Sequence, residues 1–488
     1  MSRLRPPVDR PELSRLRPPV DPVPRLTELS RLRPPVYHSE RMTRSPQFTL
    51  LVKPAGADCN LNCGYCFYLK KSELFGESSP PRMTIDTAES MLRAYFATDQ
   101  PVYSFGWQGG EPTLMGVDFF REVFEMQRRM APPNTQIQNG LQTNGTLLTP
   151  EWASLLREYN VLVGLSIDGP AGIHNTYRRW ADRDGNAIAG ESGKTHARVE
   201  QAARLLRDEK VKFNALTVVG RHNQEHAVDV YEYLRSLKIR HMQFIPLVEW
   251  DVTSNAASDT RREKGSGADH GSVQSGHTEI GESNVDSNRV SVSDYSVTAE
   301  GWGRFLSSIF DRWFPKDVRR VSIRHFDSVL EFLVRGTYNV CTMSGACAGH
   351  FVVEHRGDIY PCDFFVETRL QLGNVHDTDT GNPLIRAFDD PRRRAFRSRK
   401  ARWNERCRDC RYLWLCGGDC PKVRLPRDRF DTLRNDASVD GLSAICDGWL
   451  SFYDYTLDRF TRLARSVAPE ITGNAPVMPD AVGRWNPD

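Results

Sequence analysis

Three cysteines lie within one short stretch of the chain, at Cys59, Cys63 and Cys66. Thiolates bind iron–sulfur clusters, and a 4Fe–4S cluster normally takes four of them. No further cysteine follows until Cys341. The three cysteines therefore predict a cluster with one iron left for a ligand that the protein does not supply. A metal with an open position usually does chemistry, whereas a metal with a complete protein ligand set is usually structural.

The same three cysteines allow a second interpretation, a zinc site completed by a distant histidine or cysteine. The spacing Cys-x3-Cys-x2-Cys, followed by the aromatic Phe67, resembles the signature of the radical S-adenosylmethionine (SAM) enzymes. This resemblance implies that the open iron binds the amino and carboxylate groups of SAM.

The composition argues against several other classes of protein. The 65 Lys+Arg and 62 Asp+Glu residues give a net charge of +3, too balanced for a nucleic-acid or anionic-membrane surface. No apolar run approaches the roughly 20 residues that span a bilayer, and the N-terminus lacks the apolar segment of a secretory signal. Eleven cysteines in a chain of 488 residues indicate metal sites in a reducing compartment. The expected location is cytoplasmic.

The first 44 residues differ in composition from the rest. The heptapeptide Ser-Arg-Leu-Arg-Pro-Pro-Val occurs three times, at 2–8, 14–20 and 30–36. Paired prolines at this frequency prevent a helix, and few apolar groups are available for a core. We expect a disordered tail over 1–44, consistent with a translation start placed too far upstream. A second disordered tail is expected over 466–488.

From residue 45 onward, apolar patterns typical of strands and helices alternate. Strands are expected at 48–53, 102–107, 137–143, 161–167, 211–219 and 241–247, with helices at 84–96, 117–130, 150–159, around 199–206 and at 225–237. Six such units predict an α/β fold, a partial (β/α)6 TIM-like barrel over 45–253. The three-cysteine loop and the later polar motifs each follow a strand, at the edge where α/β barrels place active sites.

Two segments separate this barrel from the cysteine-rich C-terminal part. Residues 254–297 are rich in Ser, Gly, Asp and Asn and indicate a flexible insertion. Residues 298–340 are expected to be a helical connector. Its apolar residues recur at helical spacing, which favours core packing over a cofactor contact: Trp302, Phe305, Leu306, Ile309, Phe310 and Trp313.

Eight further cysteines follow between residues 341 and 446, enough for two sites of four thiolates each. Taken alone, the paired Cys-x2-Cys spacing suits zinc slightly better. Their intervals, with Gly357 before Cys362, resemble the SPASM extension of radical SAM enzymes, expected over 341–465. The resemblance implies two auxiliary 4Fe–4S clusters. One would be held by Cys341, Cys347, Cys362 and Cys420 (the near set), and the other by Cys407, Cys410, Cys416 and Cys446 (the outer set).

Several motifs narrow the resemblance to the anaerobic sulfatase-maturating enzymes, over about 48–465 apart from 254–297 and a smaller insertion at 182–194. They are CFY at 66–68, FGWQGGEPTL at 105–114, QTNGT at 142–146, SIDGP at 166–170 and YPCDFF at 360–365. The family implies oxidation of a Cys or Ser side chain in a sulfatase Cys/Ser-x-Pro-x-Arg motif to Cα-formylglycine. A 5′-deoxyadenosyl radical derived from SAM would remove the hydrogen from Cβ.

The same resemblance assigns roles to single residues. Asp363, next to Cys362, is expected to be the general base, although a loop carboxylate of this kind is usually only solvated. Arg178 has the planar fork that suits the SAM carboxylate, with Arg179 as the alternative register. The expected SAM contacts are Gly109, Gly110, Glu111, Ser166, Asp168, Arg178 and Leu247, and the expected substrate contacts are Tyr65, Tyr68 and Gln108.

Two other functions stay open at this point. One is a SPASM enzyme that modifies another ribosomal peptide, although the Pro-rich residues 1–44 do not suit a peptide-binding domain. The other is a non-catalytic binding protein stapled by zinc. The expected partners of the favoured function are an unfolded sulfatase segment and an electron donor such as flavodoxin or ferredoxin, with the chain acting as a monomer.

Overall fold

The computed structural model describes residues 47–74, 81–182, 185–252, 290–347, 349–424 and 441–468. The expected tail over 1–44 lies outside these ranges, as do residues 254–289 of the expected insertion and residues 469–488 of the second tail.

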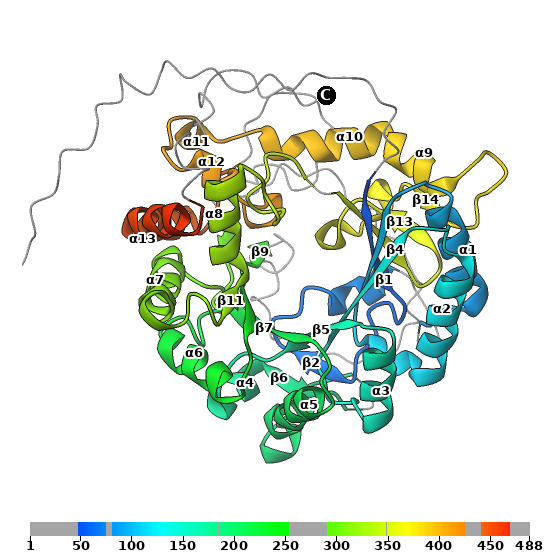
Figure 1. Cartoon of the computed structure of the whole chain (residues 1–488), viewed down its shortest axis with the longest axis horizontal. Helices are drawn as coiled ribbons and strands as arrows, with labels where there is room; N and C mark the ends of the chain where they lie inside the picture. Colours follow the sequence, from blue (N-terminus) through cyan, green and yellow to red (C-terminus); the bar gives the residue numbers. More distant parts are fainter. Residues whose placement is uncertain are drawn as a thin grey trace, which may run out of the picture.

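Six neighbouring parallel strands form the centre of the sheet, which confirms the partial α/β barrel (Figure 1). Every βα unit expected from the sequence contributes one of them. In chain order they are β1 (Thr49–Lys53), β3 (Val102–Trp107), β4 (Gln136–Thr143), β5 (Leu162–Ser166), β7 (Phe213–Val219) and β8 (His241–Pro246).

Amphipathic helices cover the outer face of the arc (Figure 1). Threonine side chains begin two of them: Thr84 Oγ1 accepts from Thr87 N at 3.1 Å and Thr149 Oγ1 from Trp152 N at 3.4 Å. These caps satisfy backbone donors that a first helical turn leaves open. The outer helices are α1 (Ile85–Phe96), α2 (Val117–Met130), α3 (Pro150–Glu158), α5 (His196–Asp208) and α6 (Ala227–Ser236).

Strand β7 begins two residues later than the sequence predicted. Val211 is buried, but its backbone N–H donates to Leu206 O at 2.8 Å and closes the end of α5. Lys210 takes a left-handed conformation at φ +58° to allow this turn. Before β5, the backbone N–H of Val161 donates to Leu156 O in the same way and closes the end of the preceding helix. An apolar residue just before a strand can therefore belong to the end of a helix.

The cysteine-rich part of the chain extends the barrel's own sheet. Strand β12 (His350–Glu354) pairs in parallel with β1, with Lys53 opposite Glu354. The antiparallel strands β13 (Asp358–Tyr360) and β14 (Gly373–Asn374) continue the sheet beyond β12. At the other edge β11 (Ser322–Ile323) adds to β8. The sheet therefore has ten strands rather than six, an extension that the sequence did not predict.

Three helices pack together beside the barrel: α7 (Ala299–Lys316), α8 (Arg324–Arg335) and α13 (Cys446–Val467). The six apolar residues predicted for core packing are all buried on α7. Phe310, for example, meets Phe460 of α13 with ring centroids 4.7 Å apart. Helix α13 continues to Val467, slightly past the expected start of the tail.

The insertion after the barrel starts and ends in a short ribbon. Strand β9 (Trp250–Val252) pairs antiparallel with β10 (Val290–Val292). Ser293, Ser296 and Val297 beyond it are buried. The last residues of the range expected to be flexible are thus part of the folded structure. No helix in the described ranges is both long and apolar enough to cross a membrane.

Candidate active site

The three-cysteine loop follows β1 and rests on the loop after β3. Gly110 N donates to Gly56 O and Glu111 N to Asp58 O, both at 2.8 Å. A Cβ on Gly110 would lie 1.8 Å from Asp58 O, so this contact requires glycine. The glycine motif therefore shapes the cysteine loop directly, which adds a structural role to the SAM contact expected from the sequence.

The Glu111 carboxylate is buried and accepts four hydrogen bonds from the protein. They come from Thr113 N and Oγ1 at 3.0 and 2.6 Å, Thr143 Oγ1 at 2.7 Å and Asn144 N at 2.7 Å. Burial raises its pKa, although these donors oppose the shift. Since Asn144 Nδ2 also donates to Cys59 Sγ at 3.8 Å, Glu111 ties the end of β4 to the cysteine loop. A ligand bound beside Glu111 would therefore contact backbone groups rather than the Glu111 carboxylate.

Asp168, just beyond β5, is fully buried in a network with Tyr65 and Arg178. It accepts from Tyr65 Oη at 2.5 Å, from Arg178 Nε at 2.8 Å and Nη2 at 3.2 Å, and from Val218 N at 3.0 Å. Burial acts to raise the pKa of Asp168, but the Arg178 charge and these donors outweigh it and lower the pKa. The network therefore holds three of the expected site residues, Tyr65, Asp168 and Arg178, in fixed positions relative to one another.

The neighbouring residues Arg178 and Arg179 have different surroundings. Strand β6 (Arg178–Trp180) pairs with β2 (Leu61–Cys63), which puts Arg178 opposite Cys63. Arg179 points elsewhere, because its guanidinium donates to Ile188 O at 3.0 Å and Asn175 O at 3.2 Å. Arg178 is the arginine beside the cysteines, and Asp168 already occupies its Nε and Nη2.

Ser166 and Leu247, two other expected SAM contacts, lie at the carboxyl ends of their strands. Ser166 ends β5, and Leu247 directly follows β8; both side chains are buried. Leu247 N donates to Val219 O at 2.9 Å and therefore continues the pairing of β7 with β8.

A histidine that the sequence did not single out lies close to this network. Both ring nitrogens of His222 are buried, and neither has a hydrogen-bond partner among the described residues. The ring lies 4.8 Å from Tyr177 and 6.3 Å from Tyr65, centroid to centroid. Buried polar atoms normally have partners, so the pair of open nitrogens fits a bound polar ligand such as SAM. No sequence spacing marks His222.

On the opposite side of the cysteine loop, Tyr68 donates to the buried Glu354 of β12. Glu354 Oε2 accepts no hydrogen bond in the part of the chain that the structure describes, and His355 Nδ1 lies 3.8 Å away. Lys53, also buried, places its ammonium 4.3 Å from the Tyr68 ring centre. Gln108, at the end of β3, donates its backbone N–H to Val52 O at 2.9 Å. The sequence analysis singled out Tyr68 and Gln108 but neither Glu354 nor Lys53.

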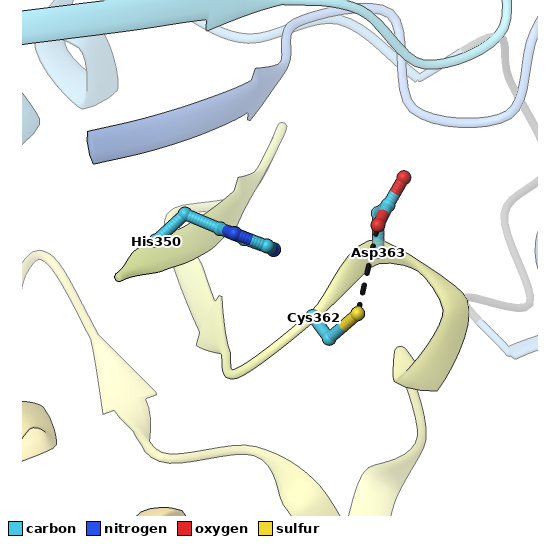
Figure 2. A group of neighbouring side chains, drawn as sticks. All are labelled: His350, Cys362 and Asp363. Atoms are coloured by element: carbon cyan, nitrogen blue, oxygen red, sulfur yellow. Dashed lines mark hydrogen bonds between the residues drawn. The ribbon is translucent and has the colours of Figure 1, made fainter. Parts of the chain in front are cut away.

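Asp363 lies beside Cys362 and His350, as Figure 2 shows. The Cys362 thiol donates to Asp363 Oδ1 at 3.6 Å, and the ligand atoms of the three residues lie within 4.8 Å of one another. His350 Nε2 is buried without a partner in the described ranges. A His–Cys–Asp group of this kind would also suit zinc. Pairing of β12 with β13 brings His350 here, which the sequence could not reveal.

The eleven thiols fall into three groups by their mutual electrostatic effects. Burial raises the pKa of nine of these thiols most, and neighbouring cysteines of the same group add to the rise. The groups are the barrel set (Cys59, Cys63 and Cys66), the near set and the outer set. The four outer cysteines line a single cavity. This donor chemistry fits iron–sulfur clusters.

A cleft of about 360 Å³ opens between the barrel and the cysteine-rich part. One wall is the barrel cysteine loop, and the facing wall directly follows Cys362 and Asp363. The residues that line it include Tyr65, Cys66, Phe67, Glu249, Trp250, Tyr295, Phe364, Phe365, Val366, Pro421 and Lys422. Two of the predicted site residues, Tyr65 and Cys66, therefore line this cleft.

Comparison with known proteins identifies the family. Residues 54–234 match the radical SAM superfamily, and residues 341–411 match an iron-sulfur cluster-binding domain, SPASM. A cysteine-type anaerobic sulfatase-maturating enzyme of Clostridium perfringens is 33% identical over 424 residues, covering 86% of this chain and 100% of the relative. The chain belongs to the anaerobic sulfatase-maturating enzyme family. It is a radical SAM enzyme, as the sequence motifs indicated.

Other members of the anaerobic sulfatase-maturating enzyme family are also similar to this chain over most of its length. A serine-type enzyme of Bacteroides thetaiotaomicron is also 33% identical, over 83% of this chain and 88% of its own length. A solved structure of anSMEcpe with bound AdoMet and Cp18Cys peptide matches with a TM-score of 0.68 at 32% identity, covering 86% of this chain and 99% of that one. The cysteine-type relative and the serine-type relative are thus equally similar to this chain in sequence identity.

Proposed function

We propose that the chain oxidises Cβ of a cysteine or serine in a Cys/Ser-x-Pro-x-Arg segment of a sulfatase to give formylglycine. The observation that carries the proposal is the cleft between the barrel set and the residues that follow Cys362 and Asp363. In a family whose solved relative holds AdoMet and a peptide, this cleft provides room for a peptide between the two kinds of cysteine site.

We assign three 4Fe–4S clusters to the three groups of thiols: the barrel set, the near set and the outer set. When bound, the barrel cluster and SAM supply the 5′-deoxyadenosyl radical that takes one hydrogen atom from the substrate Cβ. The remaining steps depend on residues of this chain. The barrel set offers three thiolates and so leaves a position for SAM, whereas each four-thiolate set is complete.

Asp363 is the proposed base. After loss of the hydrogen atom, the side chain must give up one proton and one electron to reach the oxidation level of an aldehyde. Asp363 accepts the proton, and the electron leaves through the near set, whose ligand Cys362 is its neighbour in the chain. A serine yields the aldehyde directly. A cysteine yields the thioaldehyde, which water hydrolyses with release of hydrogen sulfide.

We propose that SAM is held by the carbonyl groups around Gly109, Gly110 and Glu111, by Ser166 and Leu247 at two strand ends, and by the Asp168–Arg178 pair. The pair is buried, so Arg178 keeps a fixed position beside Cys63. Tyr65, Tyr68 and Gln108 are proposed to position the substrate, which must bring its Cβ to about 3–3.5 Å from the reacting carbon.

The proposed partners are an unfolded sulfatase segment and a one-electron donor such as flavodoxin or ferredoxin, with the chain as a monomer in the cytoplasm. Besides the Cys-x2-Cys spacing, the His350–Cys362–Asp363 group supports the alternative of zinc sites. Metal analysis separates the two, since three 4Fe–4S clusters predict about 12 iron per chain.

The direct test is anaerobic incubation of the purified enzyme with SAM, a reductant and a Cys-x-Pro-x-Arg peptide. Mass spectrometry and an aldehyde-specific hydrazine reagent should detect formylglycine, and the matched Ala-x-Pro-x-Arg peptide should stay unchanged. A crosslinked product, which lacks two hydrogens but carries no aldehyde, would instead favour a SPASM enzyme acting on another peptide. Parallel Cys and Ser peptides establish which side chain is accepted.

A further inference from the structure

Lys400 is an ammonium enclosed in the cysteine-rich part of the molecule. Its side chain is only 1% exposed, although it belongs to a strongly basic segment, residues 391–402. Its Nζ donates to the backbone carbonyls of Cys341 and Thr342, the latter at 2.9 Å. No carboxylate of the described residues pairs with it. A buried charge without an opposite charge is costly, so a counter-charge is expected at this position.

Lys400 lies in a stretch of chain that meets the near set at two points. Its ammonium donates to the Cys341 carbonyl, which ties it to the loop that starts the near set. Three residues earlier, Arg397 O accepts from the Cys347 N–H at 3.2 Å. Lys400 therefore lies beside the proposed near cluster.

The groups packed around Lys400 do not cancel its charge. Arg424 is a second buried cation, whose Nη2 donates to the Lys400 carbonyl at 2.8 Å and whose Nε donates to Gly418 O at 2.8 Å. Asp419 is a buried carboxylate close by, but its oxygens accept from Ser443 Oγ at 2.8 Å, from Trp449 Nε1 at 2.9 Å and from its neighbour's backbone. Asp419 is thus satisfied by neutral donors.

We propose that Lys400 is the counter-charge of the near cluster and raises its reduction potential, so that this cluster accepts the electron released by the substrate. The inference rests on the proposed assignment of an auxiliary cluster to the near set. A four-thiolate cluster becomes more negative when it gains an electron, and a fixed cation beside it stabilises that reduced form. Net charge and burial are among the factors that set such potentials.

The test is a potentiometric titration of the full-length, iron-loaded enzyme, followed by electron paramagnetic resonance. The near-cluster signal is first assigned as the one that Cys362→Ala removes. Lys400→Met removes the charge at similar size, Lys400→Arg keeps it, and Lys400→Gln keeps an N–H donor without charge. Lys212→Met, at an exposed lysine of the barrel, is the matched control.

Lys400→Met and Lys400→Gln should lower the ratio of reduced to oxidised near cluster at least tenfold at a fixed potential, about 59 mV for a one-electron couple. Lys400→Arg and Lys212→Met should leave the ratio close to that of the unmodified enzyme. SAM cleavage should continue in the neutral variants while formylglycine per SAM falls.

An unchanged potential in a fully loaded neutral variant would overturn the inference. Loss of the near cluster from both Lys400→Met and Lys400→Gln would also overturn it, since Lys400 would then merely hold the Cys341 loop. Absence of auxiliary cluster signals from the unmodified enzyme is a different result, which would defeat the proposed function itself.

Discussion

The barrel set and the near set use the same side chain in opposite surroundings. Around the barrel set, the charged groups are already balanced or negative: Asp168 neutralises Arg178, and the buried Glu111 raises the pKa of Cys59 after burial has done so. Around the near set, Asp363 likewise raises the pKa of Cys362 after burial, but Lys400 adds a buried positive charge that pairs with no carboxylate of the described residues. The barrel set and the near set thus differ both in their number of thiols and in the charge of the groups around them.

This difference suggests a direction for the electrons. A site with a vacant position and little positive charge favours giving an electron to a bound ligand. A complete site beside a buried cation favours receiving one. The shared sheet, in which β12 pairs with β1, fixes both kinds of site on the same framework and keeps the cleft between them.

The largest effect is expected from removing one barrel thiol. Cys59→Ser should reduce SAM cleavage to background, measured as 5′-deoxyadenosine formed under anaerobic conditions with a reductant, because the open cluster is lost. Iron should fall from about 12 to about 8 per chain. The matched control is Cys407→Ala in the outer set, which should lose a similar amount of iron and still cleave SAM. Equal SAM cleavage by Cys59→Ser and Cys407→Ala would mean that the barrel set has no special role in SAM cleavage.

Removal of the proposed base should separate SAM cleavage from product formation. Asp363→Asn should still form 5′-deoxyadenosine, whereas formylglycine should fall by roughly 10²–10⁴-fold, the usual range for a positioned acid or base. Mass spectrometry of the peptide and chromatography of 5′-deoxyadenosine from the same reaction give the ratio. Asp358→Asn, on nearby strand β13, serves as a control. Full product yield from Asp363→Asn would exclude Asp363 from the mechanism.

The cysteine spacing and the strand–helix rhythm were enough to predict the barrel and the family, whereas the assignment of the thiols to three clusters stays a prediction. The features that predict the barrel are local, since each barrel motif follows its own strand. The remainder depends on contacts between distant segments. Glu354 comes next to Lys53 because β12 pairs with β1, some 300 residues earlier in the chain, and His350 comes next to Asp363 because β12 pairs with β13. Lys400 belongs to a basic run that would ordinarily be solvated, and only the packing of the described chain shows it to be buried.

A smaller effect, on stability, is expected at the Asp168–Arg178 pair. Asp168→Asn leaves Arg178 buried without its charge partner, which typically costs about 3–5 kcal/mol. Because Arg178 lowers the pKa of Asp168, the stabilisation is present above the ordinary aspartate pKa of about 3.9 and is lost only as the pH falls below it. The difference in thermal midpoint between the iron-loaded variant and the unmodified enzyme should therefore be constant between about pH 6 and pH 8.

A strong change in that difference within this range would show that another group controls the stability. Asp168→Glu, which retains the charge, should recover part of the loss.

The smallest effect is expected at Tyr68. Tyr68→Phe removes the hydroxyl that donates to Glu354 and leaves a buried carboxylate with fewer partners, at a cost of about 1–3 kcal/mol. Thermal unfolding of the iron-loaded enzyme measures this cost. The control is Tyr455→Phe, at a tyrosine that is 49% exposed and donates to Asp311 at 2.7 Å, which should change stability by no more than about 0.5 kcal/mol. Equal losses would mean that the Tyr68–Glu354 contact is no stronger than a surface one.

The contrast between an open and a complete site is tested most directly by adding SAM to the reduced enzyme and recording its electron paramagnetic resonance spectrum. The account predicts that SAM changes one cluster signal, and that this change vanishes when Cys59, Cys63 and Cys66 are replaced together. A change that persists in the triple variant, or no change in the unmodified enzyme, would contradict the assignment of the open iron to the barrel set.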